Sequence, residues 1–299
     1  MKHIFIVNPT AGKKNCAEEI RAQLQQKENL SWDLFVAPTA DAATEYVRTC
    51  CEQMPDEKLR FYACGGDGSL SSVLRGVYGH DNASMTSYPV GSGNDFVRYY
   101  GGRERFLDLD KLLEAPEEEI DLIRAGDRLC INAFDLGFDA YVCDTMMRVR
   151  RKPLIGGNNA YYTGIITSLF NGMRTYCRMT ADGEEVIDGD ILLCTAANGK
   201  YVGGGFQCAP RSDNADGLME LCLVRPVGRL LLARLIGTYK KGGHLDDPRF
   251  APYLIYRRAK KLEITSDKPI KFVLDGDIVE ADRIEVEVLP RALRFAVPE

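Results

Sequence analysis

The chain has 299 residues, a formal net charge of −5 and 3 histidines. That length is ample for a large hydrophobic core and favours two domains over one. The weakly acidic charge gives no bulk attraction for nucleic acid or for anionic membranes, so no nucleic-acid partner is expected. Apolar residues make up 45% and charged residues 27% of the chain, which is typical of a globular protein and argues against disorder.

The 10 cysteines form no CxxC pair, so a zinc site is not expected. Several lie in apolar runs, such as Cys194 within Ile191–Ala196, which predicts buried free thiols in a reducing compartment. The apolar run Ile4–Val7 is too short for a signal peptide, and no stretch approaches the ~20 apolar residues of a spanning helix. We therefore expect a cytoplasmic protein that is at most peripheral to a membrane.

Strand-like and helix-like segments alternate in the first part of the chain. Short β-branched and aromatic runs end at turn signals, and helical patterns follow them, such as Ile20 and Leu24 at i,i+4 spacing. This alternation predicts a parallel sheet with helices on its faces. The expected strands are Ile4–Val7, Trp32–Val36, Arg60–Cys64 and Ser87–Val90.

From about Ile123 the pattern changes to runs of strand with three helical insertions, which is typical of a β-sandwich. We therefore expect an α/β protein with a doubly wound N-terminal domain over residues 1–122, joined by the tail 290–299, and a β-sandwich domain over residues 123–289. The acidic segment Glu114–Glu119 is interpreted as a linker. The expected helical insertions are Tyr141–Val149, Tyr161–Phe170 and Leu230–Tyr239.

Three turns follow predicted parallel strands: Asn8–Gly12, Gly65–Ser69 and Gly91–Asp95. In open α/β sheets, ligands bind at the edge where the strands end. Glycines there let backbone N–H groups approach an anion, and a helix that opens at such a turn favours phosphate at its N-terminus. Three turns of this kind at one edge predict a phosphate site.

A carboxylate in a phosphate cradle repels phosphate unless a metal ion or a proton-donating substrate lies between them. Asp67 is therefore a candidate Mg²⁺ partner, or the group that accepts a proton from an attacking hydroxyl, and the alternative is a helix cap. Asp95 has the same two interpretations, because Asn94 and Asp95 are a common cap and turn pair.

The stretch Gly65–Ser69 resembles the GGDGT signature of the superfamily of diacylglycerol, sphingosine, ceramide and NAD kinases and phosphofructokinases. Pro89–Phe96 resembles the P-x-GTGNDFAR motif of the lipid kinase branch, and Asn8–Gly12 resembles its NPxSG nucleotide loop. Near the end, Leu274–Asp277 resembles the D-G-E turn of that branch. The resemblance covers nearly the whole chain, including two segments of the second domain, Tyr201–Gly205 and Ala209–Gly217.

This resemblance implies an NAD-kinase-like first domain, a β-sandwich second domain, and a cleft between them for ATP and lipid. It implies Mg²⁺ with ATP as co-substrate, Asp67 as the partner of that ion, and a structural Mg²⁺ at Asp213 and Asp216. The implied catalytic residues are Asp67, Asp95 and Asp277, although Asp277 replaces the family glutamate and is one methylene shorter. The implied ATP-binding residues are Asn8, Pro9, Thr10, Gly12, Thr39, Gly65, Gly66, Gly68, Ser69, Gly91, Ser92, Gly93 and Asn94.

We therefore expect an ATP-dependent lipid kinase that phosphorylates the hydroxyl of a lipid alcohol, diacylglycerol first of all, to give phosphatidate. One alternative is an NAD kinase or other soluble-substrate kinase, which shares the Gly65–Ser69 turn but not the Gly91–Phe96 turn. A second is a non-catalytic nucleotide or lipid sensor, which the three intact aspartates disfavour. The first turn lacks a GxGxxG fingerprint, which excludes a dinucleotide oxidoreductase.

Two basic segments are candidates for transient contact with a membrane. They are Arg148–Lys152 and Arg229–Lys241, where leucines and an isoleucine alternate with basic residues. The alternative for the second is a helix that packs on the sandwich and keeps a solvated basic face. The oligomeric state is left open, with a homodimer among the options.

Overall fold

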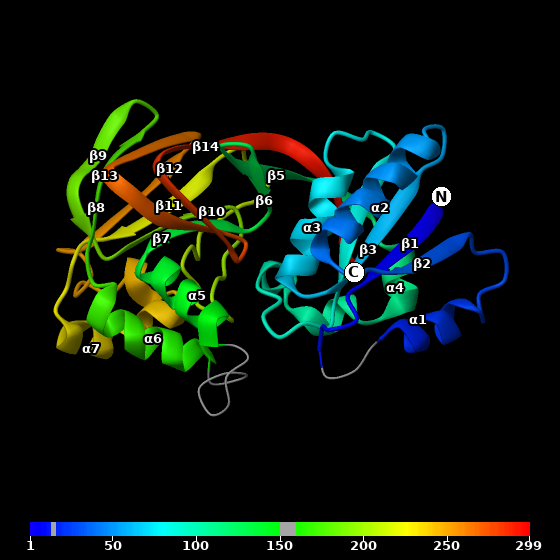
Figure 1. Ribbon diagram of the computed structural model, residues 1–299, viewed down its shortest axis with the longest axis horizontal. Coiled ribbons are helices and arrows are strands. Elements are labelled where there is room, and N and C mark those ends of the chain that lie inside the picture. The colour runs from blue at the N-terminus through cyan, green and yellow to red at the C-terminus, as the bar shows by residue number, and fades with distance from the viewer. Residues whose placement is uncertain (13–15, 150–159) are drawn as a thin grey trace. The chain divides into compact units, whose positions relative to one another are not determined.

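Figure 1 shows the computed structural model of the protein, which describes residues 1–12, 16–149 and 160–299. Packing divides the chain into two units. One unit comprises Met1–Leu122 and Pro290–Glu299, and the other comprises Ile123–Leu289.

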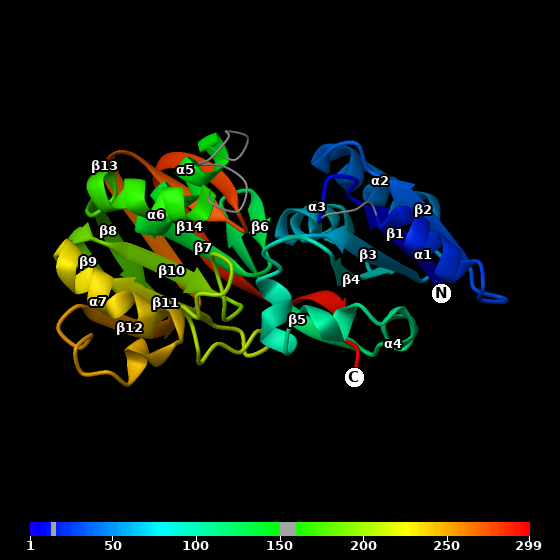
Figure 2. The same ribbon diagram turned by 90° about the horizontal axis from the view of Figure 1, so that it is seen from below.

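The first unit is built on a parallel sheet with the strand order β4-β3-β1-β2. Almost every residue of β1, β3 and β4 is buried, as expected for strands that are covered on both faces. Helices α2 and α3 lie together beside this sheet (Figures 1 and 2). The predicted doubly wound α/β architecture is confirmed. The strands are β1 (Lys2–Val7), β2 (Trp32–Val36), β3 (Leu59–Gly65) and β4 (Ala83–Pro89), and the helices are α1 (Ala17–Leu24), α2 (Ala40–Gln53), α3 (Asp67–Val77) and α4 (Leu109–Glu114).

The helices that open at the three turns differ from the expectation in one place. Helix α3 starts within the second turn, at Asp67, but the third turn leads only into η1 (Phe96–Tyr100), a five-residue 3₁₀ helix. A second short 3₁₀ helix, η2 (Arg103–Phe106), follows it. The full helix dipole is therefore available at α3 and not at the third turn.

The prediction of a linker over Glu114–Glu119 was wrong, because a strand, β5 (Glu117–Ala125), begins within it. The carboxylate of Glu117 accepts hydrogen bonds from Arg60 Nη2 at 2.9 Å and from Ser84 Oγ at 2.6 Å. Arg60 is only 4% exposed, so the acidic residue that suggests a solvated linker instead neutralises a buried guanidinium.

The second unit is an antiparallel sheet with the order β12-β11-β10-β7-β13-β14, in which β8 also pairs with β13 and β9 pairs with β8. Helices α5, α6 and α7 gather on one face of this sheet (Figures 1 and 2). The C-terminal end of β14 returns to the first unit, where Phe295 pairs with Met85 of β4. The remaining elements are β6 (Arg128–Cys130), β7 (Ala133–Gly137), α5 (Phe138–Val149), α6 (Ala160–Asn171), β8 (Thr175–Ala181), β9 (Glu184–Ile191), β10 (Leu193–Ala197), β11 (Met219–Val224), α7 (Arg229–Lys240), η4 (Gly243–Leu245), β12 (Leu254–Ala259), β13 (Lys261–Leu274) and β14 (Asp277–Ala296).

The cysteines and the candidate membrane segments have these positions in the fold. All ten cysteines are free and nine are buried, which confirms the prediction of buried thiols. Among the described residues, no helix is both long and apolar enough to cross a bilayer. Of the segment Arg148–Lys152, Arg148 forms an ion pair with Asp144, and residues 150–152 lie outside the described residues.

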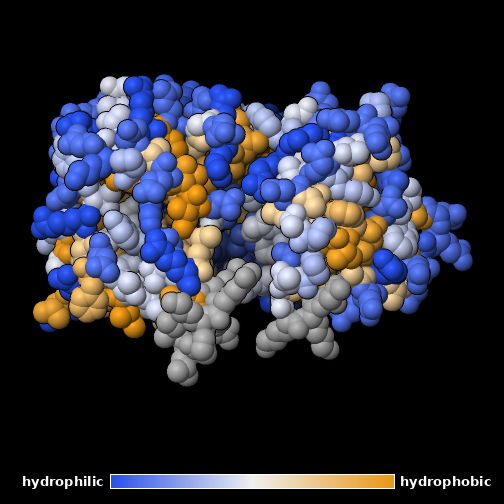
Figure 3. All heavy atoms as spheres, in the orientation of Figure 1, coloured by the Kyte–Doolittle hydropathy of each residue, from blue (hydrophilic) through white to orange (hydrophobic). Residues whose placement is uncertain are grey.

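Helix α7 has a buried apolar side, but Leu230 near its start is exposed to solvent. Leu235 and Tyr239 are buried, whereas Leu230 is 79% exposed and Phe170 of α6 is 70% exposed. Figure 3 shows mostly hydrophilic side chains on the visible face of the second unit, with apolar groups in small clusters. Contact of this region with a membrane stays a prediction.

Candidate active site

The three predicted turns meet at the carboxyl ends of neighbouring strands, β1, β3 and β4. The N–H of Gly91 donates to the carbonyl oxygen of Gly65 at 2.9 Å. A Cβ atom on Gly91 would lie 2.4 Å from Cα of Gly66, and one on Gly12 would lie 2.6 Å from the carbonyl oxygen of Val90. Because no side chain fits at these contacts, the three turns pack backbone against backbone.

Polar side chains connect the first turn to the start of α3. Asn8 Oδ1 accepts hydrogen bonds from the N–H and from Oγ1 of Thr10, both at 2.9 Å. Asn8 Nδ2 donates to Ser69 Oγ at 3.3 Å. The structure thus brings together three of the predicted nucleotide-binding residues. Thr39 lies after the next strand, β2, and its Oγ1 caps α2 by accepting from Ala42 N at 3.1 Å.

Asp67 is the first residue of α3, and its carboxylate is held by the third turn. Oδ1 accepts a hydrogen bond from the N–H of Asp95 at 2.8 Å. The N-cap of α3 is Gly66, so Asp67 is not the cap of its own helix. A Cβ atom on Gly93 would lie 2.6 Å from Oδ2, which means that this oxygen faces a residue without a side chain. Burial raises the pKa of Asp67, and the backbone N–H groups of the third turn oppose that rise only in part.

The third turn is fixed by its own polar residues. Asn94 adopts a positive φ of 53°, and its Nδ2 donates to the carbonyl oxygen of Gly91 at 2.7 Å. The carboxylate of Asp95 is buried and forms an ion pair with Arg98 Nε at 3.2 Å. Asp95 therefore contributes its backbone to the position of Asp67, while its side chain is already neutralised.

In the second unit, Asp275 and Gly276 form the two-residue turn between β13 and β14. Their φ angles are 48° and 95°, as a type I′ hairpin turn requires, and Asp-Gly is a typical sequence for it. Asp277, the predicted second carboxylate, is the first residue of β14 and is half-buried. The hairpin thus sets the position of Asp277 at the end of a long strand pair.

Asp275 is a residue whose role the sequence analysis missed. Its Oδ2 accepts from the N–H of Ile131 at 2.7 Å, and its Oδ1 accepts from the N–H groups of Asn132 and Ala133, both at 3.1 Å. The thiol of Cys130 also donates to Oδ1 at 3.0 Å. The Asp-Gly dipeptide signals the turn, but no local pattern signals that the carboxylate binds a distant run of backbone N–H groups.

The two aspartates predicted to hold a structural Mg²⁺ are engaged by protein groups. Asp213 Oδ1 accepts from Ala215 N at 3.1 Å, and Asp216 Oδ1 accepts from Leu218 N at 3.0 Å. Asp216 also forms an ion pair with Arg258, which competes with a bound cation. Across residues 1–12, 16–149 and 160–299, no three histidine, cysteine, aspartate or glutamate side chains gather to hold a metal. The structural Mg²⁺ site stays a prediction.

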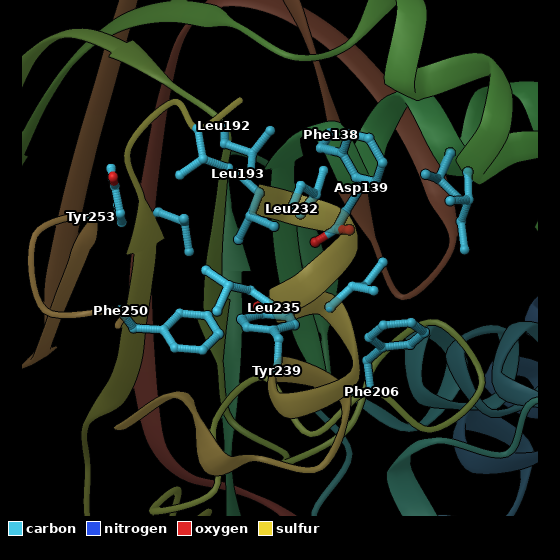
Figure 4. Close-up of a pocket in the computed structure, with 15 residues that line it drawn as sticks. Phe138, Asp139, Leu192, Leu193, Phe206, Leu232, Leu235, Tyr239, Phe250 and Tyr253 are labelled. Atoms are coloured by element: carbon cyan, nitrogen blue, oxygen red, sulfur yellow. The ribbon is translucent and has the colours of Figure 1, made fainter. Parts of the chain in front are cut away.

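A pocket lies between α5, α6, α7 and the sheet of the second unit (Figure 4). Of the fifteen described residues that line it, fourteen are apolar or aromatic and one, Asp139, carries a carboxyl group. Leu232, Leu235 and Ile236 of α7 belong to this lining. These three residues of α7 therefore face the interior of the unit, which agrees with a helix packed on the sandwich, whereas Leu230 of the same helix is exposed.

The fold and these turns define a class of protein: a two-unit α/β chain whose first unit offers three glycine turns and a carboxylate at one sheet edge. Family models agree with this class. The diacylglycerol kinase catalytic domain matches residues 2–125, and the YegS C-terminal NAD kinase beta sandwich-like domain matches residues 132–297. The chain therefore belongs to the diacylglycerol kinase catalytic-domain family, in the branch with a YegS-type C-terminal domain.

Individual relatives support the same assignment. A "Probable lipid kinase YegS-like" of Pseudomonas fluorescens is 28% identical over 295 residues, which covers 96% of this chain and 93% of that protein. A diacylglycerol kinase of Mycobacterium tuberculosis is 29% identical over 241 residues, covering 78% and 75%. A solved diacylglycerol kinase structure from Bacillus anthracis has the same fold, with a TM-score of 0.68 at 18% identity, and the match covers 99% of this chain and 96% of that one. The family is one of lipid kinases, and the predicted family is confirmed.

Proposed function

We propose that the chain is an ATP-dependent kinase that transfers the γ-phosphoryl group to the hydroxyl of a lipid alcohol, with diacylglycerol as the first acceptor to test and phosphatidate as its product. The observation that carries this proposal is the position of Asp67. Its carboxylate lies where three glycine turns meet, at the sheet edge that binds ligands in this class of fold. A phosphate site with a carboxylate inside it suits phosphoryl transfer to an alcohol.

The nucleotide is proposed to bind over the three turns. Phosphoryl transfer depends on positioning and charge stabilisation more than on covalent chemistry of the protein. A Cβ atom on Gly68 would meet no atom within 4 Å, so the backbone there faces open space in which a phosphate can lie. The N-terminus of α3 adds favourable dipole charge at this place. Asn8, Thr10 and Ser69 would complete the contacts.

Mg²⁺ bound with ATP would neutralise phosphate charge, and it is usually held by one or two carboxylates together with the phosphates. Asp67 fits this role, because Oδ1 is fixed by Asp95 N–H while Oδ2 lies beside the bare Cα of Gly93. To hold a second ion, Asp213 and Asp216 would need further ligands from backbone carbonyls and water. Arg258 would also have to move away from Asp216.

A carboxylate can also take the proton of the attacking hydroxyl. An alcohol has a pKa far above 7, so the proton moves as the new P–O bond forms and not before. Burial raises the pKa of Asp67, which makes it a better proton acceptor than an exposed aspartate. Asp277 is the second candidate for this role.

The apolar pocket of the second unit supports a lipid acceptor over a soluble one. Fourteen of its fifteen described lining residues are apolar or aromatic, and such a lining favours a hydrocarbon chain over a polar substrate. The ribose and phosphates of NAD would find few hydrogen-bond partners there. An apolar chain site agrees with the lipid kinase branch of the family.

Transfer of ³²P from ATP to a panel of acceptors tests the proposal. The panel comprises diacylglycerol, ceramide, a long-chain base and a polyprenol in mixed micelles, together with NAD. We expect a phosphorylated lipid with the wild type, and a loss of at least about 100-fold with Asp67→Asn. Asp110→Asn, an exposed carboxylate outside the site, is the matched control and should keep full activity. Equal activity of the wild type and Asp67→Asn, or transfer to NAD alone, would contradict the proposal.

A further inference from the structure

A surface groove lies in the second unit where the end of α6 meets the start of α7. Its free volume is about 470 Å³, and Phe170, Arg174 and Arg229 are among the residues that line it. None of its eight described lining residues is acidic. The groove shares only Val227 with the described lining of the apolar pocket in Figure 4, so the two are separate cavities.

The two arginines make the groove cationic. Arg229 Nε donates to the carbonyl oxygen of Leu169 at 2.6 Å, and among the residues that the structure describes Arg229 pairs with no carboxylate. Arg174 pairs with Asp190 at 3.2 Å, but both side chains are exposed, and an exposed ion pair contributes little. The segment Arg229–Lys241 holds four basic residues and no acidic one. A chain with a net charge of −5 therefore presents a local basic surface here.

Apolar side chains stand out of the surface beside the groove. Phe170 and Leu230 are mostly exposed, and Ile166, one helical turn before Phe170, is 58% exposed. The guanidinium of Arg229 lies 5.8 Å from the centre of the Phe170 ring, which helps to hold that ring at the surface. Figure 3 shows apolar side chains at the lower edge of the second unit, where Figure 1 places the ends of α6 and α7. Single exposed apolar residues are ordinary, but a group of them beside two arginines indicates an interaction surface.

We propose that this surface docks on a membrane that carries anionic phospholipids. A headgroup phosphate binds in the groove between Arg174 and Arg229, and the side chains of Ile166, Phe170 and Leu230 enter the boundary between headgroups and acyl chains. Charge complementarity selects this occupant, because basic residues that flank exposed apolar and aromatic ones are typical of surfaces that lie on anionic bilayers. The inference goes beyond the proposed function and does not depend on it, since docking needs neither ATP nor turnover.

Sedimentation with vesicles tests the inference. The vesicles are phosphatidylcholine alone and phosphatidylcholine mixed with phosphatidylglycerol. We expect the wild type to bind the mixed vesicles at least about tenfold more tightly, and Arg174→Gln and Arg229→Gln each to weaken that binding about fivefold at low salt. Phe170→Ser combined with Leu230→Ser should weaken binding to both kinds of vesicle at least about tenfold. Equal affinity of the wild type for the two kinds of vesicle, or wild-type binding by these variants, would overturn the inference.

Matched controls separate this surface from charge and exposure in general. Arg283→Gln removes an exposed arginine from the β13–β14 strand pair, and Tyr78→Ser removes an exposed aromatic residue from the first unit. Both should bind the mixed vesicles as the wild type does. Thermal unfolding shows that each variant is folded. If the controls weakened binding as much as the groove variants, docking would not belong to this surface.

A tryptophan at position 170 reports on contact with the bilayer directly. The wild type has one tryptophan, Trp32 of the first unit, whose emission should not change when vesicles are added. The emission of Phe170→Trp should shift to shorter wavelength with the mixed vesicles and be quenched by lipids with brominated acyl chains. If the bound variant showed neither effect, another face of the protein would contact the membrane, and the inference would fail.

The kinase assay separates this inference from the proposed function. Binding to the mixed vesicles without ³²P transfer to any lipid alcohol would sustain the inference and refute the proposed function. Transfer to diacylglycerol in detergent micelles, together with no binding to the mixed vesicles, would do the reverse.

Discussion

The backbone N–H of Asp95 donates a hydrogen bond to the carboxylate of Asp67 at 2.8 Å, so the turn after β4 positions the residue that starts α3. Two segments that follow different strands are thereby locked to each other at the sheet edge. This bond uses the main chain of Asp95, while the side chain of Asp95 is paired with Arg98 at 3.2 Å. The two aspartates therefore have different roles, although they look alike in the sequence.

Asp95→Asn should retain activity within about tenfold of the wild type, because the backbone donor to Asp67 remains while the ion pair with Arg98 is lost. Asp67→Asn should lose at least about 100-fold in the same ³²P transfer assay. If Asp95→Asn were as inactive as Asp67→Asn, the carboxylate of Asp95 would belong to the chemistry itself.

Gly93→Ala should lower phosphoryl transfer about tenfold to 100-fold, because the added Cβ would lie 2.6 Å from Oδ2 of Asp67 and displace the carboxylate. The free energy of unfolding should change by less than about 1 kcal/mol. Steady-state kinetics and urea unfolding measure the two effects. Gly237→Ala is the control, since its Cβ would meet no atom within 4 Å. Full activity of Gly93→Ala would show that Oδ2 has room to move without consequence.

Asp275→Asn should destabilise the second unit by about 2–4 kcal/mol, measured by chemical unfolding. The carboxylate accepts from three backbone N–H groups and the Cys130 thiol, and an amide nitrogen in its place would leave one or more of those donors unpaired. Asp182→Asn is a useful comparison, because Asp182 also accepts backbone N–H groups but lies at the exposed end of a hairpin. If Asp275→Asn were as stable as the wild type, water would have to replace the hydrogen bonds that the carboxylate accepts.

Asp277→Asn should lower kcat with little change in stability if this residue takes the acceptor's proton. Asp277→Glu restores the longer side chain that the family motif carries and should keep at least wild-type activity. The assay is again ³²P transfer, combined with a thermal unfolding control. Full activity of Asp277→Asn would leave Asp67 as the sole proton acceptor among the predicted carboxylates.

Local signals explain which parts of this structure the sequence predicts. The parallel strands and the glycine turns have short-range patterns, and the sheet brings Asn8, Asp67 and Gly91 together because their strands are neighbours. The strand character of Glu117 depends on Arg60 and Ser84, 57 and 33 residues away, so an acidic run was mistaken for a linker.

Side-chain partners far along the chain account for the other omissions. Asp275 binds backbone groups more than 140 residues away. In the sequence, Asp139 resembles any acidic residue in the first turn of a helix. Its burial in an apolar pocket arises only when α7, 90 residues further on, packs above it.

Asp139→Asn should be more stable than the wild type above pH 6 and no more stable near pH 4. Burial raises the pKa of Asp139 from 3.8 to about 6, so the folded wild type binds a proton more tightly than the unfolded chain does. The stabilisation from that proton is complete below pH 3.8 and is lost as the pH rises through 6. Since one pKa unit corresponds to ~1.4 kcal/mol, the advantage of the variant should level off at no more than about 3 kcal/mol above pH 7. Urea unfolding of both proteins between pH 4 and pH 8 measures it. A difference that is independent of pH would show that Asp139 titrates as an ordinary exposed carboxylate, and that the pocket around it is filled with water.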